Sequence, residues 1–575
     1  MDKYIVEKSK DNYDILKIVN DKRSIYIGSK YNEKREIDKF INLAGEMTEK
    51  DNYVVLGLGT GNHIKELIKA KHNQAKILVI ECEKEWSNKL NFKDKDVIVA
   101  KSIEDIQNFL YNYVNEFNIH YLKIIPYANY NKIYEKDIAH ECKYIKEYFE
   151  KLIININTKI KFHDIWFEFR IKNLKYLCES TYITELKGKY RNKPAIIVSA
   201  GPSLSKNIEC LKDNKNALII SGGRTLKSLL GINVIPDYVT IIDPSEYSYA
   251  LVKDYIGFYH NTLIYMDNIN NKILNKHKGK KIILSDNKKI ERIYIEEHIK
   301  KYSGGSVSHT MTELAILMGC NPIIFIGQDF AYTNDKGHAD IASSPWKRVN
   351  IKNYEEDDDV YVKSLDGSIV RTSKYLNLFK KNMEYIIDEH KHIEFINATE
   401  GGALIKGAEN KTLKETLENI NYSLDNSNTV KEKIHENIIV KNKIINCIKN
   451  TIVNINKINK LTIEILHLLK KAEQSIKFDL KNKQYIFYKL EKLEEKYTNI
   501  EKGIYFFEEI LYPIIYEVNY EKEYIIKNND NNINEIIKQI KRKELYYSKI
   551  NNIYIEKIEF IKKCFNEIEQ ENIKN

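Results

Sequence analysis

The sequence predicts an α/β protein of several domains with a doubly wound, mostly parallel sheet at its centre. Short apolar runs alternate with amphipathic segments through the middle of the chain, which is the pattern of repeated strand–helix units. Near the N-terminus, a glycine-rich turn follows an apolar run, as in Rossmann-like domains. From residue 409 onward glycine and proline are scarce, and Ile and Leu recur at helical spacing, which predicts an all-α region.

The chain of 575 residues is too long for one hydrophobic core, so several domains are expected. A hydrophobic content of 43% and a charged content of 30% are typical of soluble globular proteins. We expect a Rossmann-like domain at 1–150, a helical connector at 151–193, a central α/β domain at 194–408 and a C-terminal helical domain at 409–575.

The composition also disfavours several classes of protein. The N-terminal segment is polar and no apolar window reaches membrane-spanning length, so a cytoplasmic protein without a membrane span is expected. The seven cysteines are scattered singly, which disfavours structural zinc and a disulfide framework. The net charge is +10, but the basic residues are interleaved with acids, so nucleic acid is not an expected partner.

The N-terminal region contains YVVLGLGTGNHIKELI, which reads as a strand, the glycines Gly57, Gly59 and Gly61, and a helix. A second predicted strand ends at Glu81, about twenty residues beyond the last glycine. This arrangement fits a nucleotide fingerprint, in which the carboxylate accepts from the ribose of a ligand such as S-adenosylmethionine. Alternatively, the glycines only permit the helix to pack closely on the sheet.

The connector and the C-terminal region are predicted to be helical. In the connector, Trp166, Phe167 and Phe169 occur at near-helical spacing and are expected to pack between domains. The segment KIINCIKNTIVNINKINKLTIEILHLLKKAEQ predicts long helices of a bundle. This bundle either packs on the central domain or offers a docking surface to an acceptor protein.

Polar turns follow successive strands of the predicted central domain. The segment PAIIVSAGPSL reads as a strand over Ala195–Val198 and a turn, in which Gly201 and Ser203 place N–H groups near a helix start. Such N–H groups bind anions. Gly222 follows the next strand, and Asp243 ends the strand VTIID. We therefore expect these residues to hold a nucleotide.

A glycine-serine loop and an apolar strand form the most informative segment. The loop, GGSVSHT, contains Gly304, Gly305, Ser306 and Ser308, which are further candidates for nucleotide binding. A short apolar helix, a turn and the strand IIFIG follow. Ligands of open α/β sheets bind beyond the carboxyl ends of the strands, so this order predicts a site for a phosphorylated ligand.

Four polar side chains come just after the strand IIFIG. Gln328 and Asp329 end the strand, and the following loop carries Tyr332 and His338. A second polar turn, with Glu400, follows the strand HIEFIN on the same edge. Gln328 and Glu400 are candidate substrate contacts, and a structural turn is the alternative for Glu400.

Five motifs in this order resemble the motility accessory factor family: SAGPSL, IIDPSE, GGSVSHT, GQDFAYTNDKGHAD and NATEGGALIKG. Members of that family are flagellin glycosyltransferases that attach nonulosonic acids. Their central domain is similar to the GT-A-like fold of bacterial sialyltransferases and to the archaeal 6-hydroxymethylpterin diphosphokinase (MptE-like) group. The resemblance is strong over residues 194–408 and looser over the rest of the chain.

The resemblance implies an inverting transfer of a nonulosonic acid, of the pseudaminic or legionaminic type, from a CMP-activated co-substrate to Ser or Thr of flagellin, in support of motility. We expect no tightly bound cofactor, and no metal because the sequence has no dense acidic cluster. The resemblance also implies a Rossmann-like N-terminal domain without established methyl transfer. That favours the packing interpretation of the three glycines.

The chemistry of this transfer needs a base and a group that stabilises the departing phosphate. We expect His338 to be the general base, because imidazole titrates near neutral pH. Tyr332 matches the phosphate-binding tyrosine of the related sialyltransferases, although Ala331 occupies the position directly after Phe330. Asp329 is expected either to take part in catalysis or to organise its loop through backbone N–H groups.

Three functions remain open from the sequence. The first is the CMP-nonulosonic acid-dependent glycosyltransferase. The second is a pterin diphosphokinase, which needs ATP, magnesium and grouped carboxylates such as Asp243 and Asp329. The third is a non-catalytic flagellin-binding accessory protein. Asp243 either contacts ribose or sugar, or caps its turn.

Overall fold

The computed structural model describes residues 3–20, 23–214, 216–295, 305–333, 336–344, 359–420, 434–478, 482–528 and 530–574. Contacts divide the chain into two compact units. Unit 1 consists of residues 1–163, 455–501 and 510–556, and unit 2 consists of residues 164–454, 502–509 and 557–575. The expected range 1–150 lies in unit 1 and the range 194–408 lies in unit 2. The helices of 409–575 contribute to both units.

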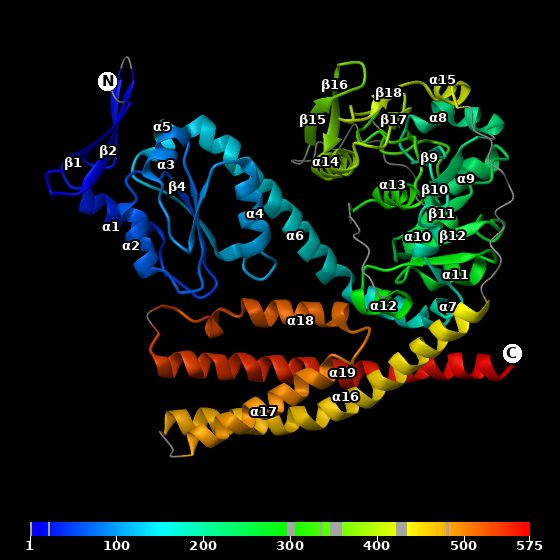
Figure 1. The fold of residues 1–575 in the computed structure, drawn as a ribbon. Helices are drawn as coiled ribbons and strands as arrows, with labels where there is room; N and C mark the ends of the chain where they lie inside the picture. The colour runs from blue at the N-terminus through cyan, green and yellow to red at the C-terminus, as the bar shows by residue number, and fades with distance from the viewer. Residues whose placement is uncertain are drawn as a thin grey trace. The chain divides into compact units, whose positions relative to one another are not determined.

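Unit 1 begins with an antiparallel sheet, which a small parallel α/β sheet follows (Figure 1). Its elements up to residue 133 are β1 (Tyr4–Lys8), β2 (Asp14–Asn20), β3 (Arg23–Ile27), α1 (Glu33–Leu43), β4 (Asn52–Leu56), α2 (Asn62–Ala70), β5 (Ile77–Ile80), α3 (Lys84–Leu90), β6 (Val97–Ala100), α4 (Ile103–Tyr113), β7 (Leu122–Pro126) and α5 (Tyr130–Ile133). The parallel sheet has the order β6-β5-β4-β7. Every residue of β4 and β5 is buried, which explains the apolar runs YVVL and ILVI.

Aromatic side chains of unit 1 fill the space around the glycine-rich turn between β4 and α2. A Cβ atom at Gly57 would lie 2.6 Å from the ring of Tyr130, and one at Gly61 would lie 2.7 Å from the ring of Phe92. The buried carboxylate of Glu81 accepts hydrogen bonds from the Tyr130 hydroxyl, at 2.6 Å, and from a main-chain N–H of the same turn, at 2.8 Å. This geometry agrees with the interpretation that the glycines permit close packing. Aromatic rings fill the space beside Gly57 and Gly61, and the Glu81 carboxylate is hydrogen-bonded within the protein.

Long helices make up the connector and the C-terminal region. They are α6 (Glu135–Lys172), α7 (Leu174–Leu177), α16 (Ile434–Lys477), α17 (Lys483–Glu501), α18 (Glu508–Tyr520) and α19 (Asn532–Lys574). The connector helix therefore begins before residue 151. Its Phe167 is buried in unit 2, with its ring centroid 5.2 Å from that of Phe507 and 6.3 Å from that of Phe560.

The central sheet of unit 2 has nine strands, all parallel. They are β8 (Thr181–Tyr182), β9 (Ala195–Val198), β10 (Leu218–Gly222), β11 (Tyr238–Ile241), β12 (Thr262–Met266), β13 (Lys281–Leu284), β14 (Ile323–Ile326), β17 (Phe395–Asn397) and β18 (Glu409–Asn410). Their order is β18-β17-β14-β9-β10-β11-β12-β13-β8. The chain thus adds strands on one side of β9 up to β13 and then returns to add β14, β17 and β18 on the other side. The predicted strand at Ala195–Val198 is confirmed.

Helices cover both sides of this sheet. They are α8 (Leu204–Asn207), α9 (Gly223–Gly231), α10 (Glu246–Val252), α11 (Asn271–Lys276), α12 (Lys288–Tyr294), α13 (Val307–Leu317), α14 (Lys374–Glu389) and α15 (Leu413–Glu418). Figure 1 shows α9 and α11 on one side of the sheet and α13 on the other. An antiparallel hairpin, β15 (Asp359–Lys363) with β16 (Ile369–Ser373), precedes α14. Short 3₁₀ helices lie at Ile119–Tyr121, Ile183–Leu186, Ile208–Asp213 and Lys522–Tyr524.

A fully buried arginine joins α6 to the central sheet. The guanidinium of Arg170 donates to the carboxylate of Asp267, which follows β12, at 3.1 and 3.2 Å, and also pairs with Glu509. The side chains of Arg170 and Asp267 have no solvent-exposed surface. A buried charge is tolerated only when it is paired, so this contact requires that residues 170, 267 and 509 fold together.

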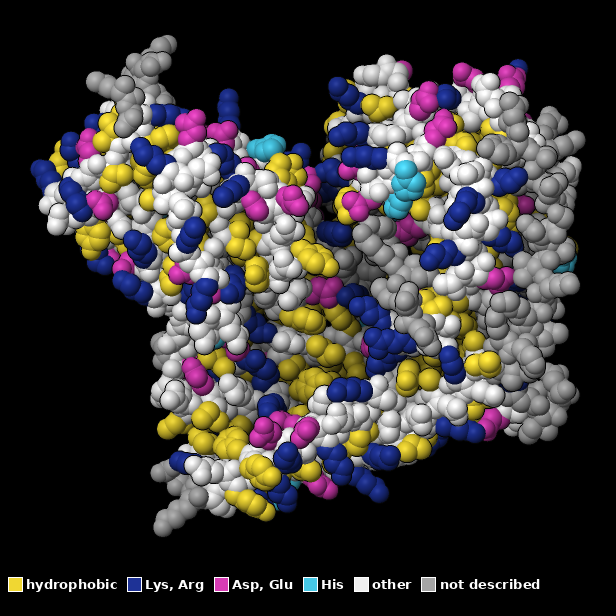
Figure 2. All heavy atoms as spheres, viewed as in Figure 1, with side chains coloured by type: hydrophobic (Ala, Val, Ile, Leu, Met, Phe, Trp, Pro, Cys, Tyr) yellow, Lys and Arg dark blue, Asp and Glu magenta, His cyan; other side chains and the backbone are white. Residues whose placement is uncertain are grey.

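The predicted fold class is confirmed: a Rossmann-like N-terminal part, a central doubly wound α/β sheet and a C-terminal helical region. Within the described ranges, no helix combines the length and the apolar character needed to cross a membrane. On the face drawn in Figure 2, Lys and Arg side chains stand among Asp and Glu over both units.

Candidate functional site

The candidate site lies at the carboxyl edge of the nine-stranded sheet. Because all strands are parallel, the loops that follow β9, β10, β11, β14 and β17 emerge at this one edge. The direction in which the chain adds strands changes between β9 and β14. Open α/β sheets bind their ligands at such a point. The carboxyl edge is therefore the place where a ligand is expected to bind.

Asp329 is the centre of a buried network between the loops that follow β9 and β14. Its carboxylate accepts hydrogen bonds from the Ser203 hydroxyl at 2.6 Å, from the Ser203 N–H at 3.1 Å and from the Thr333 hydroxyl at 2.7 Å. Its main-chain carbonyl accepts from the N–H of Ala403, in the loop after β17. Asp329 thus joins three loops, which corresponds to the organising role considered for it above.

The environment of Asp329 acts on its pKa in two opposite ways. Burial is the largest effect and raises the pKa of this carboxyl above its ordinary value. The hydrogen bonds from Ser203 and Thr333 stabilise the charged form and lower the pKa. The net direction is upward, because only 2% of the residue is exposed to solvent.

The glycines around Asp329 allow the loops to approach one another. A Cβ atom at Gly201 would lie 2.2 Å from the Asp329 carboxylate, and one at Gly402 would lie 2.3 Å from the Asp329 carbonyl. The N–H of Gly201 donates to the carbonyl of Gly327 at 2.7 Å. We expected Gly201 and Ser203 to offer N–H groups to a nucleotide. In the structure the protein's own acceptors occupy both, because the tight turn directs them at the neighbouring loop.

Gln328 and Glu400 are also held by neighbouring residues. The side-chain carbonyl of Gln328 accepts from the Ser199 hydroxyl at 2.6 Å. Glu400 has a positive φ of 57° and its carboxylate accepts from the amide of Asn207 at 3.2 Å. The main-chain carbonyl of Glu400 accepts from Lys206 at 2.7 Å. These bonds correspond to the structural turn that was the alternative for Glu400.

Tyr332 lies on a loop that is attached to the hairpin. Its N–H donates to the carbonyl of Arg371 at 2.9 Å, and the Arg371 guanidinium lies 5.2 Å from the centre of the Tyr332 ring. Arg371 also forms an ion pair with Asp359 at 3.0 Å. The phenol is therefore partly covered by an arginine whose charge is already paired.

His338 is exposed and lies beside the first loop of the site. The N–H of the next residue, Ala339, donates to the carbonyl of Ala200 at 3.0 Å. The hydroxyl of Ser228, on α9, donates to the carbonyl of Ile341 at 2.9 Å. The segment 336–344 is thus held against the loop after β9 and against α9, which places the imidazole at the carboxyl edge.

The glycine-serine loop ends in the first turn of α13. Gly304 lies outside the described residues, and Gly305 has a positive φ of 81°. Helix α13 begins inside the motif, at Val307, with Ser306 at its N-cap and the hydroxyl oxygens of Ser306 and Ser308 3.2 Å apart. A Cβ atom at Gly222 would lie 3.3 Å from Val307. The structure therefore brings Gly222 close to Val307 of the glycine-serine motif.

Two further polar residues near this edge have structural contacts. His309 is buried in α13 and contacts the carbonyl of Phe379 through Nε2 at 2.8 Å. Burial lowers its pKa. Asp243 is exposed, and its carboxylate accepts from the N–H of Ser245 at 2.8 Å, which is the turn-capping role.

Several polar groups at this edge were not predicted. Arg224 follows Gly222 and Gly223 directly after β10, and its guanidinium donates to the carbonyl of Ser343. The hydroxyls of Ser221, Thr240 and Ser343 are buried and have no hydrogen-bond partner among the described residues. Buried hydroxyls are normally bonded, so unpartnered ones mark a place for a ligand or water. The signal in the sequence was the arginine in a glycine turn after a strand.

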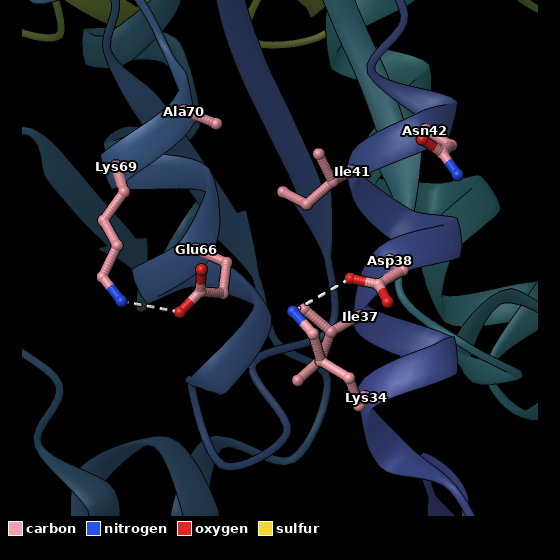
Figure 3. A pocket seen from close by; sticks show the side chains of 8 residues that line it. All are labelled: Lys34, Ile37, Asp38, Ile41, Asn42, Glu66, Lys69 and Ala70. Atoms are coloured by element: carbon pink, nitrogen blue, oxygen red, sulfur yellow. Dashed lines mark hydrogen bonds and ion pairs between the residues drawn. The ribbon is translucent and has the colours of Figure 1, made fainter.

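A groove on unit 1 shares no residue with this edge (Figure 3). Its volume is ≈ 530 Å³, and it is lined by Lys34, Ile37, Asp38, Ile41, Asn42, Glu66, Lys69 and Ala70, on α1 and α2. The four charged side chains form two ion pairs, Lys34 with Asp38 and Lys69 with Glu66. The groove therefore has an apolar floor and self-paired rims, and the site is not placed there.

Comparisons with known proteins match the central region and the whole fold. Residues 170–335 match the family model described as 6-hydroxymethylpterin diphosphokinase MptE-like. An uncharacterized protein of Treponema pallidum (strain Nichols) is 26% identical over 146 residues, which are 25% of this chain and 66% of that protein. The solved structure of a Maf glycosyltransferase from Magnetospirillum magneticum AMB-1 has a TM-score of 0.53 and 14% identity. The match covers 99% of this chain and 95% of that chain.

The expected resemblance is therefore confirmed at two levels. The family model covers most of the strands that form the candidate site. The structural match extends over unit 1 and the C-terminal helices as well. Residues 170–335 are similar to the MptE-like family, and the whole chain is similar in fold to a Maf glycosyltransferase.

Proposed function

We propose that this chain is a glycosyltransferase that moves a nonulosonic acid from a CMP-activated donor to Ser or Thr of flagellin, in the cytoplasm. The observation that carries the proposal is the shared fold with a Maf glycosyltransferase over 99% of the chain. The five motifs that resemble the flagellin glycosyltransferases support the donor and the acceptor. The function requires no tightly bound cofactor and no metal.

The proposed step is an inverting displacement. The acceptor hydroxyl oxygen forms a bond to the anomeric carbon while the bond from that carbon to the phosphate oxygen breaks, and CMP leaves with the electron pair. His338 takes the proton of the acceptor hydroxyl. Its exposed position at the carboxyl edge is compatible with a protein acceptor. Tyr332 stabilises the departing phosphate, and Asp329 holds the two loops in place through Ser203.

The test is incubation of the purified chain with flagellin and CMP-pseudaminic or CMP-legionaminic acid, read by intact mass. A mass increase equal to whole nonulosonic acid residues supports the function. Boiled enzyme and UDP-sugars serve as controls. No mass change with either CMP-sugar, on flagellin taken before glycosylation, would contradict it.

A second candidate rests on a different observation. The family model that matches residues 170–335 takes its description from a 6-hydroxymethylpterin diphosphokinase. Such an enzyme would transfer diphosphate from ATP to 6-hydroxymethylpterin. Asp329 is buried and hydrogen-bonded to Ser203 and Thr333, so its carboxylate is not open in the way that metal binding requires. Formation of AMP from ATP, magnesium and the pterin would favour this function.

A further inference from the structure

Arg224 is held in a fixed position at the carboxyl edge. It lies in the first turn of α9, directly after β10, and is half-buried. Its Nη1 donates to the carbonyl of Ser343 and its Nη2 to the hydroxyl of Tyr247, both at 3.2 Å. The guanidinium lies 5.3 Å from the centre of the Tyr247 ring. Three elements, α9, α10 and the segment 336–344, thus meet at this side chain.

Two other arginines of unit 2 have a carboxylate partner. Arg170 pairs with Asp267, and Arg371 pairs with Asp359. No carboxylate pairs with Arg224 within the parts of the chain that the structure describes. A guanidinium has five N–H donors, and only two of its hydrogen bonds are accounted for here. The remaining donors and the positive charge are available to an anion.

A second observation at the same place also indicates a ligand. The N–H of Ser343 donates to the carbonyl of Arg224 at 3.0 Å, so the two residues are bonded in both directions. The hydroxyl of Ser343 is unpartnered among the described residues, and only 4% of the residue is exposed. The Ser221 hydroxyl, at the end of β10, is likewise buried and unpartnered. A ligand oxygen would satisfy both a hydroxyl and a guanidinium N–H.

We infer that Arg224 contacts the phosphate of the nucleotide donor and that Tyr247 and Ser343 orient its guanidinium. The identity of the nucleotide rests on the proposed function, whereas the contact itself requires only a phosphate at this edge. A planar guanidinium presents paired N–H groups that match two phosphate oxygens. As the bond to the sugar breaks, charge accumulates on those oxygens, and a preoriented cation stabilises it.

The experiment is calorimetric titration of the full-length chain with CMP, UMP, AMP and GMP, and with each matching nucleoside. Arg224→Gln should weaken binding of the preferred monophosphate by about ten- to a hundredfold and leave the nucleoside unchanged, because hydrogen bonds to charged groups are the strong ones. Lys227→Gln is the matched control. It removes one positive charge from an exposed position of the same helix and should change both affinities by less than about twofold.

Two further variants separate a contact from a structural effect. Arg224→Lys keeps the positive charge but loses the planar pair of N–H groups. It should therefore bind the monophosphate more weakly than the wild type and more tightly than Arg224→Gln. Tyr247→Phe removes only the hydroxyl that accepts from Nη2 and should weaken the monophosphate by a few-fold. If Arg224→Gln does not fold, the order of these two variants against the wild type decides the question.

The outcomes are distinct from those of the proposed function. If the wild type binds UMP, AMP or GMP more tightly than CMP, and Arg224→Gln still weakens that binding, the proposed CMP donor is wrong. The contact between Arg224 and a phosphate would nevertheless be supported. Unchanged monophosphate affinity in Arg224→Gln, an equal loss for the nucleoside, or an equal loss in Lys227→Gln would each overturn the inference. So would a wild-type chain that binds no monophosphate.

Discussion

The hydroxyl of Ser203 donates a 2.6 Å hydrogen bond to Asp329, and this bond joins the loops that follow β9 and β14. The two loops leave the sheet at the point where the chain changes the direction in which it adds strands. Asp329, for which either a part in catalysis or an organising role was expected, is thus buried beneath the edge. At the surface of the edge, His338 and Asp243 are exposed and Arg224 is half-buried.

Asp329→Ala should lower the free energy of unfolding by about 2–4 kcal/mol, because the Ser203 and Thr333 groups lose their buried acceptor. Urea denaturation followed by circular dichroism measures the change. Asp243→Ala is the matched control, since this exposed carboxylate accepts only from the N–H of Ser245 and should cost about 1 kcal/mol or less. Equal effects of the two variants would contradict the role given to Asp329.

Glu33→Gln should change how stability depends on pH. Burial raises the pKa of Glu33 to about 7 from an ordinary value of 4.5. The folded state therefore holds the proton more tightly than the unfolded state, and the stability that this group contributes is lost as the pH rises from 4.5 to about 7. Denaturation midpoints between pH 4.5 and 8 should show Glu33→Gln gaining about 2–3 kcal/mol over the wild type across that interval.

Tyr127→Phe provides the control for Glu33. The Tyr127 hydroxyl donates to the Glu33 carboxylate and lowers its pKa, so its loss should raise that pKa further. The stability of the variant should then fall more steeply with pH than that of the wild type. Parallel profiles for all three proteins would show that Glu33 does not titrate in this range.

Gly61→Ala should destabilise unit 1 more than Gly45→Ala. Both glycines have positive φ, 83° and 63°, which costs an alanine about 1–2 kcal/mol. Only Gly61 adds a clash, because its Cβ atom would lie 2.7 Å from Phe92, whereas a Cβ atom at Gly45 has no neighbour within 4 Å. Melting temperatures compare the two. Specific retention of S-adenosylmethionine that depends on Glu81 would instead revive the cofactor interpretation.

His338→Ala should reduce transfer to flagellin by about a hundredfold or more and leave CMP affinity nearly unchanged, since loss of a general base costs about 10²–10⁴ in rate. The defect should shrink at higher pH, where the acceptor hydroxyl ionises more easily. Initial rates from pH 6 to 10, with calorimetry of CMP binding, test both statements. Wild-type turnover in this variant would place the base elsewhere.

Tyr332→Phe should lower turnover with a smaller effect on the KM for flagellin, because the phenol acts on the leaving phosphate. Its defect should not recover at high pH, unlike that of His338→Ala. Steady-state kinetics of the two variants, measured side by side with one flagellin preparation, separate the two roles. A Tyr332→Phe variant with normal turnover would leave Arg224 as the group at the phosphate.

The strands of the site could be read from the sequence, because an apolar run such as Ala195–Val198 between a proline and a glycine turn has few other structures open to it. The polar residues that follow these strands could also be assigned to the carboxyl edge of the sheet, because parallel strands all end at that edge. The use of each group was not predictable. The N–H of Gly201 donates to Gly327, and that bond depends on a loop more than a hundred residues away. The role of Arg224 was not predicted, because Ser343, which accepts its hydrogen bond, lies 119 residues away in the sequence.

The division of the chain into units has a consequence for when each unit can complete its folding. Unit 1 includes residues 510–556 and unit 2 includes residues 557–575, and α19 contributes to both. On the ribosome, neither unit can reach its final set of contacts until the last helix has emerged. A stop codon after residue 420 would remove Glu509 and leave Arg170 with one fewer buried partner. Loss of α19 would therefore remove residues from both units at once.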